Sequence, residues 1–232
     1  MKNRKIILIP VVSLGIILIS FVAFRRIRTN RIVNGYFKEA RWHELKNLHA
    51  TYKKQGHLTV FFGNSITEQL KFFLPESDSL FNMGISGDFS EGLIKRLDNV
   101  TRLKPDNLFI KIGINDIVER VPLSKIKTNY LQILDRVASE CPDTKIYIQS
   151  TLPTRDLKSF FRSSKDINKI VMKLNLFLKM QAQERKITFI DLYPDFADEN
   201  NEMKQELTTD GVHLNETGYN IWKKHLSKFI SI

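Results

Sequence analysis

Short, strongly apolar runs alternate with longer segments of helical periodicity from residue 58 onward, and this alternation restricts the fold more than any other feature. Two of the runs, Thr59–Phe62 and Leu108–Ile110, lack the polar–apolar alternation of half-exposed strands, as expected for strands that are covered on both faces. The expected strands are Leu58–Phe62, Leu80–Met83, Leu108–Ile112, Ile146–Gln149 and Ile187–Asp191, and the clearest expected helices are Leu123–Glu140, Ile167–Glu184 and Thr217–Phe229. Strands and helices in this order predict an α/β domain around a parallel sheet of five strands, joined by right-handed crossovers.

The first residues of the chain have a different character. Ile6 to Phe24 is an uncharged, almost wholly apolar run with basic residues on both sides. As a helix it would span roughly 28 Å, close to the thickness of a bilayer's hydrocarbon core. A cleavable signal peptide would need a shorter apolar core and small residues at its cleavage site, and the bulky Phe21 two positions before Ala23 does not fit this. We therefore expect an uncleaved N-terminal transmembrane helix, with a cleaved signal segment and a helix of a soluble domain as the alternatives.

Charge and cysteine content limit the partners. The formal net charge is +11 at pH 7, but much of the excess lies in residues 1–31, and the rest of the chain is nearly balanced. A nucleic-acid-binding protein would carry a basic face on its folded domain, so we expect a membrane partner for the N-terminal helix and no nucleic-acid partner. Cys141 is the only cysteine, which excludes an internal disulfide and a cysteine-rich metal site.

These features predict three parts of the chain. Residues 1–31 form a membrane anchor or signal segment, residues 32–57 an amphipathic connector, and residues 58–232 the α/β domain. The basic residues at the two ends of the apolar run are similar in number, so the orientation in the membrane is weakly determined. We expect the α/β domain on the extracytoplasmic side, in the cell envelope.

Three polar clusters each follow an expected strand, and the carboxyl ends of parallel strands meet at one edge of the sheet. The clusters are Gly63-Asn64-Ser65, Gly84-Ile85-Ser86-Gly87-Asp88 and Gly113-Ile114-Asn115-Asp116. Each cluster is also typical of a helix cap or a turn. Together at one edge they could supply a serine hydroxyl, a backbone N–H that no Cβ obstructs, and an asparagine amide.

A fourth cluster, Asp210-Gly211-Val212-His213, lies just before the last expected helix. An aspartate three residues before a histidine can accept a hydrogen bond from the Nδ1–H of its ring within one tight loop. The Nε2 atom of His213 is then available to take the proton of Ser65. The other histidines have no comparable acid and glycine beside them.

The four clusters, in this order, resemble the four sequence blocks of the SGNH (GDSL-type) hydrolases, which are esterases, lipases and acetylhydrolases. The resemblance covers the chain from about Leu58 to its C-terminus. It implies a flavodoxin-like three-layer α/β/α sandwich, which agrees with the alternation of strands and helices. The first block usually reads Gly-Asp-Ser and here contains Asn64 instead. Because that aspartate is not a triad member in the family, Asn64 should change the local hydrogen bonds without abolishing catalysis.

The resemblance also implies a role for each site residue. Ser65 would be the nucleophile, His213 the general base and Asp210 the acid that orients it. The oxyanion hole would be formed by the backbone N–H groups of Ser65 and Gly87 and by the side chain of Asn115. No metal ion and no organic cofactor would be required.

We therefore expect a serine esterase that hydrolyses short-chain acyl esters, acetyl esters foremost, on a carbohydrate or a lipid. One alternative is an envelope O-acyltransferase, which would use the same site with a sugar hydroxyl in place of water. Another is an inactive, anchored binding module, whose expected mark is a broken triad, and the sequence shows no such break.

Overall fold

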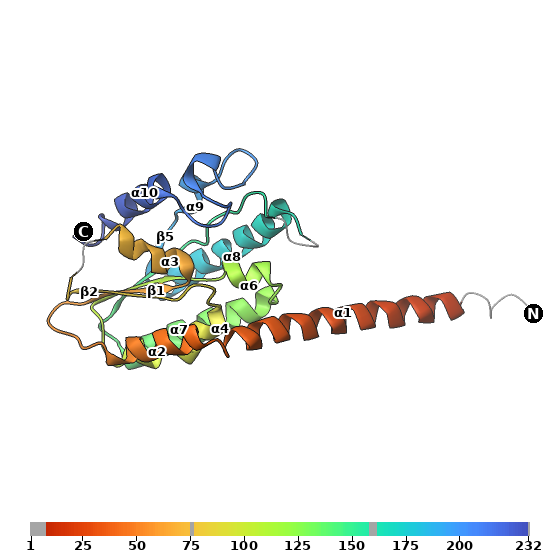
Figure 1. The fold of residues 1–232 in the computed structure, drawn as a ribbon, viewed down its shortest axis with the longest axis horizontal. Coiled ribbons are helices and arrows are strands. Elements are labelled where there is room, and N and C mark those ends of the chain that lie inside the picture. The colour runs from red at the N-terminus through yellow and green to blue at the C-terminus, as the bar shows by residue number, and fades with distance from the viewer. Residues whose placement is uncertain (1–7, 75–76, 158–161, 232) are drawn as a thin grey trace, which may run out of the picture.

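A five-stranded parallel sheet forms the centre of the protein, in the order β2-β1-β3-β4-β5 (Figure 1). The computed structural model describes residues 8–74, 77–157 and 162–231. The strands are β1 (Thr59–Gly63), β2 (Leu80–Gly84), β3 (Asn107–Lys111), β4 (Lys145–Gln149) and β5 (Thr188–Ile190). Every predicted strand is confirmed, and no end differs by more than one residue. The strand order is that of flavodoxin-like folds, so the predicted fold class is also confirmed.

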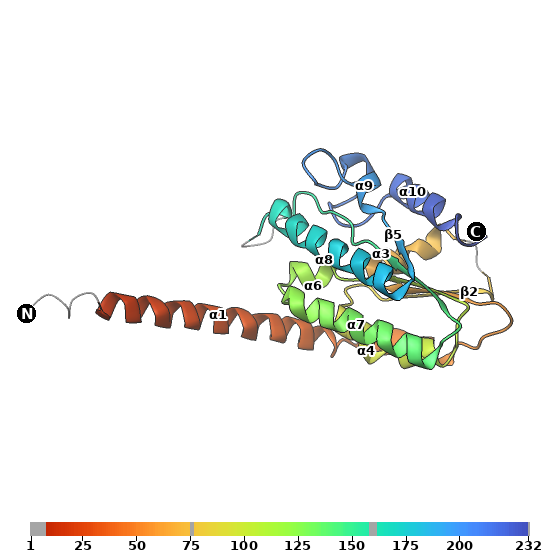
Figure 2. The same ribbon diagram turned by 180° about the vertical axis from the view of Figure 1, so that it is seen from behind.

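The helices cover both faces of this sheet (Figures 1 and 2). The α-helices are α1 (Leu8–Tyr36), α2 (Ala40–Thr51), α3 (Ser65–Gln69), α4 (Ser90–Lys95), α5 (Asp98–Thr101), α6 (Ile114–Val118), α7 (Leu123–Glu140), α8 (Ser164–Arg185), α9 (Tyr193–Phe196) and α10 (Glu216–Leu226), and the 3-10 helices are η1 (Leu70–Phe72) and η2 (Gln205–Leu207). α3 and α10 lie together on one face, where the Tyr219 hydroxyl donates to the Ile66 carbonyl at 2.9 Å. On the other face, α7 packs against α4 on one side and against α8 on the other.

The register of the sheet brings the ends of three strands together. Gly63, the last residue of β1, lies opposite Gly84 of β2 and Lys111 of β3. Every residue of β1 and β3 is buried, because helices cover both faces of the central strands. The three polar clusters that follow these strands therefore start from the same edge, as the sequence predicts.

The N-terminal helix requires a correction. α1 is one helix from Leu8 to Tyr36 whose first half projects from the domain (Figure 1). No helix in residues 8–74, 77–157 or 162–231 is long and apolar enough to cross a membrane, so the predicted transmembrane helix and its membrane partner are not supported. The apolar part of α1 continues without a break into a segment with four arginines (Arg25, Arg26, Arg28 and Arg31). Ile6 and Ile7, with which the predicted span begins, lie outside the described residues. The extracytoplasmic location stays a prediction.

The second half of α1 packs against the α/β domain. The Thr29 hydroxyl donates to the Glu119 carbonyl at 2.9 Å, and the Tyr36 hydroxyl donates to the Ser86 carbonyl at 2.8 Å. α2 follows within the predicted connector and buries Trp42, whose indole N–H donates to Asp88 at 3.2 Å. Residues 19–51 thus add a helical layer that contacts the edge where the polar clusters lie.

Candidate active site

Ser65 is the first residue of α3, directly after β1. The N-cap is Asn64, whose backbone is extended and whose side-chain oxygen accepts from the Ile66 N–H at 3.2 Å. Ser65 therefore does not serve as the cap. The preceding glycine is required, because a Cβ at Gly63 would collide with the Thr67 hydroxyl and the Lys111 carbonyl. The departure from the usual Gly-Asp-Ser block thus has a local function, since asparagine is as good an N-cap as aspartate.

His213 lies between Ser65 and Asp210. Its Nε2 atom is 2.9 Å from Ser65 Oγ, and its Nδ1 atom is 2.7 Å from Asp210 Oδ2. The other oxygen of Asp210 accepts from the backbone N–H groups of Val212 at 3.0 Å and of His213 at 2.8 Å. Burial alone would raise the pKa of Asp210, but these hydrogen bonds hold it below its ordinary value. The carboxylate therefore stays ionised and fixes the ring that faces Ser65.

The loop that carries this pair has a fixed shape. Gly211 has a φ of +86°, a conformation that favours glycine, and a Cβ there would collide with the Arg155 carbonyl. The Gly211 carbonyl accepts from the Arg155 N–H at 2.9 Å. Thr208 Oγ1 accepts from the Gly211 N–H at 2.9 Å and donates to the His213 carbonyl at 2.7 Å. The spacing between Asp210 and His213 is thus held by contacts on both sides of the loop.

Gly87 and Asn115 lie together on the neighbouring loops. Gly87 has a φ of +81°, and the ring of Tyr36 fills the space where its Cβ would stand. Asn115 occupies the first turn of α6, and its Nδ2 atom donates to the Asp88 carbonyl at 2.9 Å. An asparagine amide has two N–H donors, so this bond orients the side chain and leaves one donor.

Glu68 connects the Ser65 helix to the Gly87 loop. One of its carboxylate oxygens accepts from both the N–H and the hydroxyl of Ser86, each at 2.6 Å. Arg41 of α2 donates to the other oxygen at 2.5 Å. Burial alone would raise the pKa of Glu68, but these bonds hold it below its ordinary value. The sequence analysis missed Glu68, whose only local signal is its place in the first turn after Ser65.

A buried ion pair contacts both the end of β1 and the loop that contains Gly87. The sequence analysis did not predict this pair. Arg96 Nε lies 2.8 Å from Asp88 Oδ2, and neither side chain is exposed at all. The same guanidinium donates to the carbonyls of Met83 at 2.6 Å and Gly63 at 2.8 Å. Burial raises the pKa of Asp88, and the ion pair with Arg96 opposes this shift. Arg96 thus connects the residues just before Ser65 with the residue just after Gly87.

A second buried carboxyl orders the start of α4. Asp116, the residue after Asn115, accepts from the N–H of Ser90 at 2.9 Å and from its hydroxyl at 2.6 Å. Burial raises the pKa of Asp116 to about 7, although the bonds from Ser90 lower it. In the part of the chain that the structure describes, no group of three or more His, Cys, Asp or Glu side chains is placed to hold a metal ion.

The sequence of the chain matches the model of the GDSL-like lipase/acylhydrolase family over residues 61–221. The chain belongs to this family. As a GDSL-like acylhydrolase it is a carboxylic ester hydrolase, so the predicted family and enzyme class are both confirmed. The matched range contains every predicted site residue. None of the curated proteins is similar enough in sequence to match this chain.

Solved structures of bacterial proteins have the same fold. A GDSL-like lipase from Bacteroides thetaiotaomicron is 25% identical with a TM-score of 0.72, over 82% of this chain and 96% of that one. A proposed acylhydrolase from Bacteroides fragilis is 27% identical with a TM-score of 0.71, over 80% and 93%. A proposed platelet activating factor from Streptococcus pneumonia is 25% identical with a TM-score of 0.70, over 82% and 92%. The family resemblance therefore extends through nearly the whole of these proteins.

Proposed function

We propose that this GDSL-like acylhydrolase cleaves short-chain acyl esters, acetyl esters foremost, with Ser65, His213 and Asp210 as its catalytic triad. The observation that carries the proposal is the placement of His213, with Ser65 at 2.9 Å from one ring nitrogen and Asp210 at 2.7 Å from the other. A serine hydroxyl is a weak nucleophile until a neighbouring base takes its proton. The ionised Asp210 holds the ring in the tautomer that can do so.

The reaction proceeds in two acyl transfers. Ser65 Oγ attacks the ester carbonyl carbon while His213 Nε2 takes the hydroxyl proton, which gives a tetrahedral oxyanion. The N–H groups of Ser65 and Gly87 and the free amide N–H of Asn115 would donate to that oxyanion. The intermediate collapses, the C–O bond of the ester breaks, and His213 protonates the leaving alcohol. Water then attacks the acyl-enzyme with His213 as base, which releases the carboxylic acid and restores Ser65.

The space beside the nucleophile supports a small acyl group. A cavity of about 10 Å³ lies against the residues that flank Ser65 and the loops after β3 and β4. Ser65 itself does not line this cavity. Most of the wall is apolar, and the lining residues are Asn64, Ile66, Lys111, Ile112, Ile114, Thr151 and Leu152. A cavity of this size holds about one water-sized group, which suits the methyl of an acetyl ester. Longer acyl chains would need the surrounding side chains to move.

The test is the loss of activity in Ser65→Ala, measured with p-nitrophenyl acetate and by labelling with a fluorophosphonate probe. Ser139→Ala is the matched control, because Ser139 is an exposed serine on α7. We expect Ser65→Ala to lose both hydrolysis and labelling while its far-UV circular dichroism stays unchanged, and Ser139→Ala to retain both. Undiminished hydrolysis by Ser65→Ala would refute the proposal. If wild-type protein fails to react with the probe, the inactive binding module becomes the better interpretation.

The acyltransferase alternative uses the same acyl-enzyme with a sugar hydroxyl as the acceptor. Adding an acetyl donor together with an unacetylated oligosaccharide distinguishes the two functions. A hydrolase releases acetate at the same rate with or without the sugar. Acetylated sugar formed at the expense of acetate would show that the protein is a transferase.

A further inference from the structure

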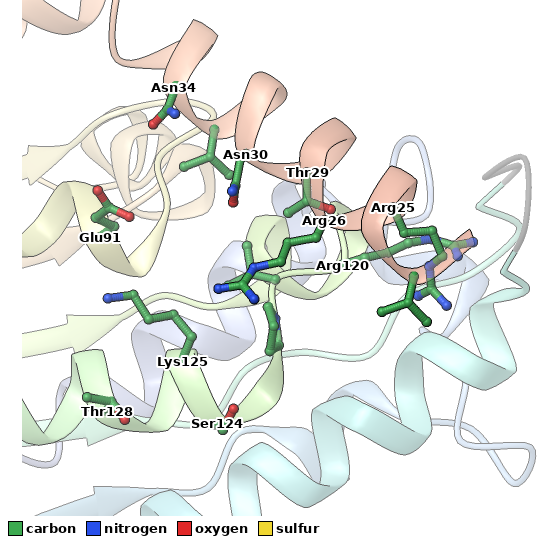
Figure 3. A pocket seen from close by; sticks show the side chains of 14 residues that line it. Arg25, Arg26, Thr29, Asn30, Asn34, Glu91, Arg120, Ser124, Lys125 and Thr128 are labelled. Atoms are coloured by element: carbon green, nitrogen blue, oxygen red, sulfur yellow. The ribbon is translucent and has the colours of Figure 1, made fainter. Parts of the chain in front are cut away.

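A large groove lies outside the site described above, between α1 and the α4–α7 side of the domain (Figure 3). Its volume is about 790 Å³, within the range of small-molecule pockets in proteins. Most of its exposed wall is apolar, and Val22, Val33, Val121 and Pro122 lie in it. Among them stand cations and hydroxyl and amide groups: Arg25, Arg26, Thr29, Asn30, Asn34, Arg120, Ser124, Lys125 and Thr128. α1 supplies one wall, and the segment after α6 together with α7 supplies the other. We call this space the basic groove.

Two cations of the basic groove, Arg26 and Lys125, have no acid of the groove as a partner. Among the described residues, neither Arg26 nor Lys125 makes an ion pair or a side-chain hydrogen bond. The acid in the lining is Glu91, which is paired with Lys95 at 3.1 Å. Figure 3 shows Arg26 extending from α1 into the space toward α7, from which Lys125 also extends. Two cations thus face the same space from opposite walls.

Arg120 and Arg25 line the other end of the basic groove. Burial is the largest cause that lowers the pKa of Arg120, and the charges of Arg162, Arg25 and Arg28 lower it further, while Glu119 opposes the shift. Arg120 and Arg25 therefore repel each other at this end of the groove. A bound anion would offset the repulsion between these cations, because arginine pairs with phosphate and carboxylate oxygens through two parallel hydrogen bonds.

We propose that the basic groove binds a small ligand that carries two or more phosphate groups. Arg26 and Lys125 hold one phosphate between the walls, and Arg25 and Arg120 hold another at the far end. Hydroxyl donors such as Ser124 and Thr128 supply further hydrogen bonds, and these suit a phosphate, which has more acceptor oxygens than a carboxylate. The ligand also joins α1 to α7.

This site is independent of the proposed hydrolysis, since none of its lining residues belongs to the triad or the oxyanion hole. The basic groove is nevertheless joined to the candidate active site through the chain itself. α1 passes from the basic groove to Tyr36, whose ring lies against Gly87, and Arg120 follows Asn115 by only a few residues. The test is therefore direct binding, which gives the same answer whether or not the protein hydrolyses esters.

The experiment is isothermal titration calorimetry of the full chain with tripolyphosphate at low ionic strength. The test variant is the double substitution Arg26→Gln/Lys125→Gln, which removes a cation from each wall. The matched control is Arg31→Gln/Lys38→Gln, which removes the same net charge from exposed positions that do not line the basic groove. We expect the test variant to weaken binding by roughly tenfold for each lost charge, hence about a hundredfold, and the control by less than about threefold.

Two outcomes would overturn the proposal. If wild-type protein shows no binding, or if both double variants lose affinity equally, the groove is not a specific site and the net charge of the chain explains any binding. A separate titration with citrate, which carries carboxylates in place of phosphates, tests whether the groove selects phosphate. Citrate binding as tight as that of tripolyphosphate would refute a phosphate site. Weaker citrate binding, together with slower hydrogen exchange of α1 residues 22–34 when tripolyphosphate is present, would support it.

Discussion

Replacing Arg96 by methionine tests how much the buried contacts of this side chain contribute to stability and to the geometry of the candidate active site. The side chain is fully buried, pairs with Asp88 at 2.8 Å and donates to the carbonyls of Gly63 and Met83. Methionine has a similar length and no donors. The variant therefore leaves the Asp88 carboxyl and two carbonyls in the interior without their partner.

The expected cost is large for a single substitution. Removing one partner of a buried ion pair typically destabilises a protein by about 3–5 kcal/mol, because the remaining charge is buried and unpaired. A protein of 150–250 residues loses roughly 2–4 °C in Tm for each kcal/mol, so we expect a decrease of about 10 °C. The kcat of the proposed reaction should also fall, because Gly63 precedes the proposed nucleophile Ser65 by two residues and Asp88 follows Gly87. Misplacing these backbones should lower kcat by roughly ten- to a hundredfold with a smaller effect on KM.

Urea unfolding followed by tryptophan fluorescence measures the stability, and p-nitrophenyl acetate hydrolysis measures kcat and KM. The control is Lys95→Met at the preceding position, where the half-exposed ammonium pairs with Glu91 and lies 5.1 Å from the centre of the Phe37 ring, so the loss should stay within about 1 kcal/mol. Adding Asp88→Asn to Arg96→Met should recover part of the lost stability, since it removes the uncompensated charge. An unfolding midpoint for Arg96→Met equal to that of Lys95→Met would refute the reasoning.

Three further predictions concern buried or catalytic positions. Burial lowers the pKa of Lys111 from its ordinary 10.5 to about 7, so between these values the unfolded chain binds more protons than the folded one. The free energy of unfolding should therefore rise with pH by up to about 1.4 kcal/mol per unit in this range, and urea titrations of Lys111→Met should lack that slope. Asn115→Ala should lower kcat by about 10²–10³-fold with little change in KM, and an effect confined to KM would remove Asn115 from the oxyanion hole. Gly92→Ala should lower the urea midpoint by the equivalent of about 1–3 kcal/mol, because the new Cβ would collide with the buried Asp88 carboxylate; an unchanged midpoint would show that α4 can shift without cost.

The sequence by itself determined the fold and the composition of the candidate active site. Strand and helix signals are local, since they depend on apolar runs and periodicity within a few residues, and this is why every strand was predicted within one residue of its observed ends. The polar clusters around Ser65, Gly87 and Asn115 follow those strands, and a parallel sheet ends its strands at one edge. The pair Asp210–His213 needs only a tight loop. Its hydrogen bond is a consequence of spacing that the sequence already contains.

The N-terminal helix is where the structure does not support the prediction. The apolar run from Ile6 predicts a membrane span, and no helix among residues 8–74, 77–157 and 162–231 is long and apolar enough for one. In the structure the same helix continues through its arginines to Tyr36, and its second half packs on the domain. The sequence also leaves open which residue of the Gly63-Asn64-Ser65 cluster caps α3, and the side-chain geometry assigns the N-cap to Asn64.

Only the tertiary structure decided which charged residues are buried, which are paired and which face a common space. In the sequence, Arg96 follows Lys95 and looks like another surface cation, yet one is fully buried against Asp88 and the other is half exposed. Arg26 and Lys125 are far apart in the chain, and only the packing of the second half of α1 on the domain brings them to the same groove. The physical reason is that the energy of a charge depends on its distance from other charges and from water, and the complete fold sets both distances.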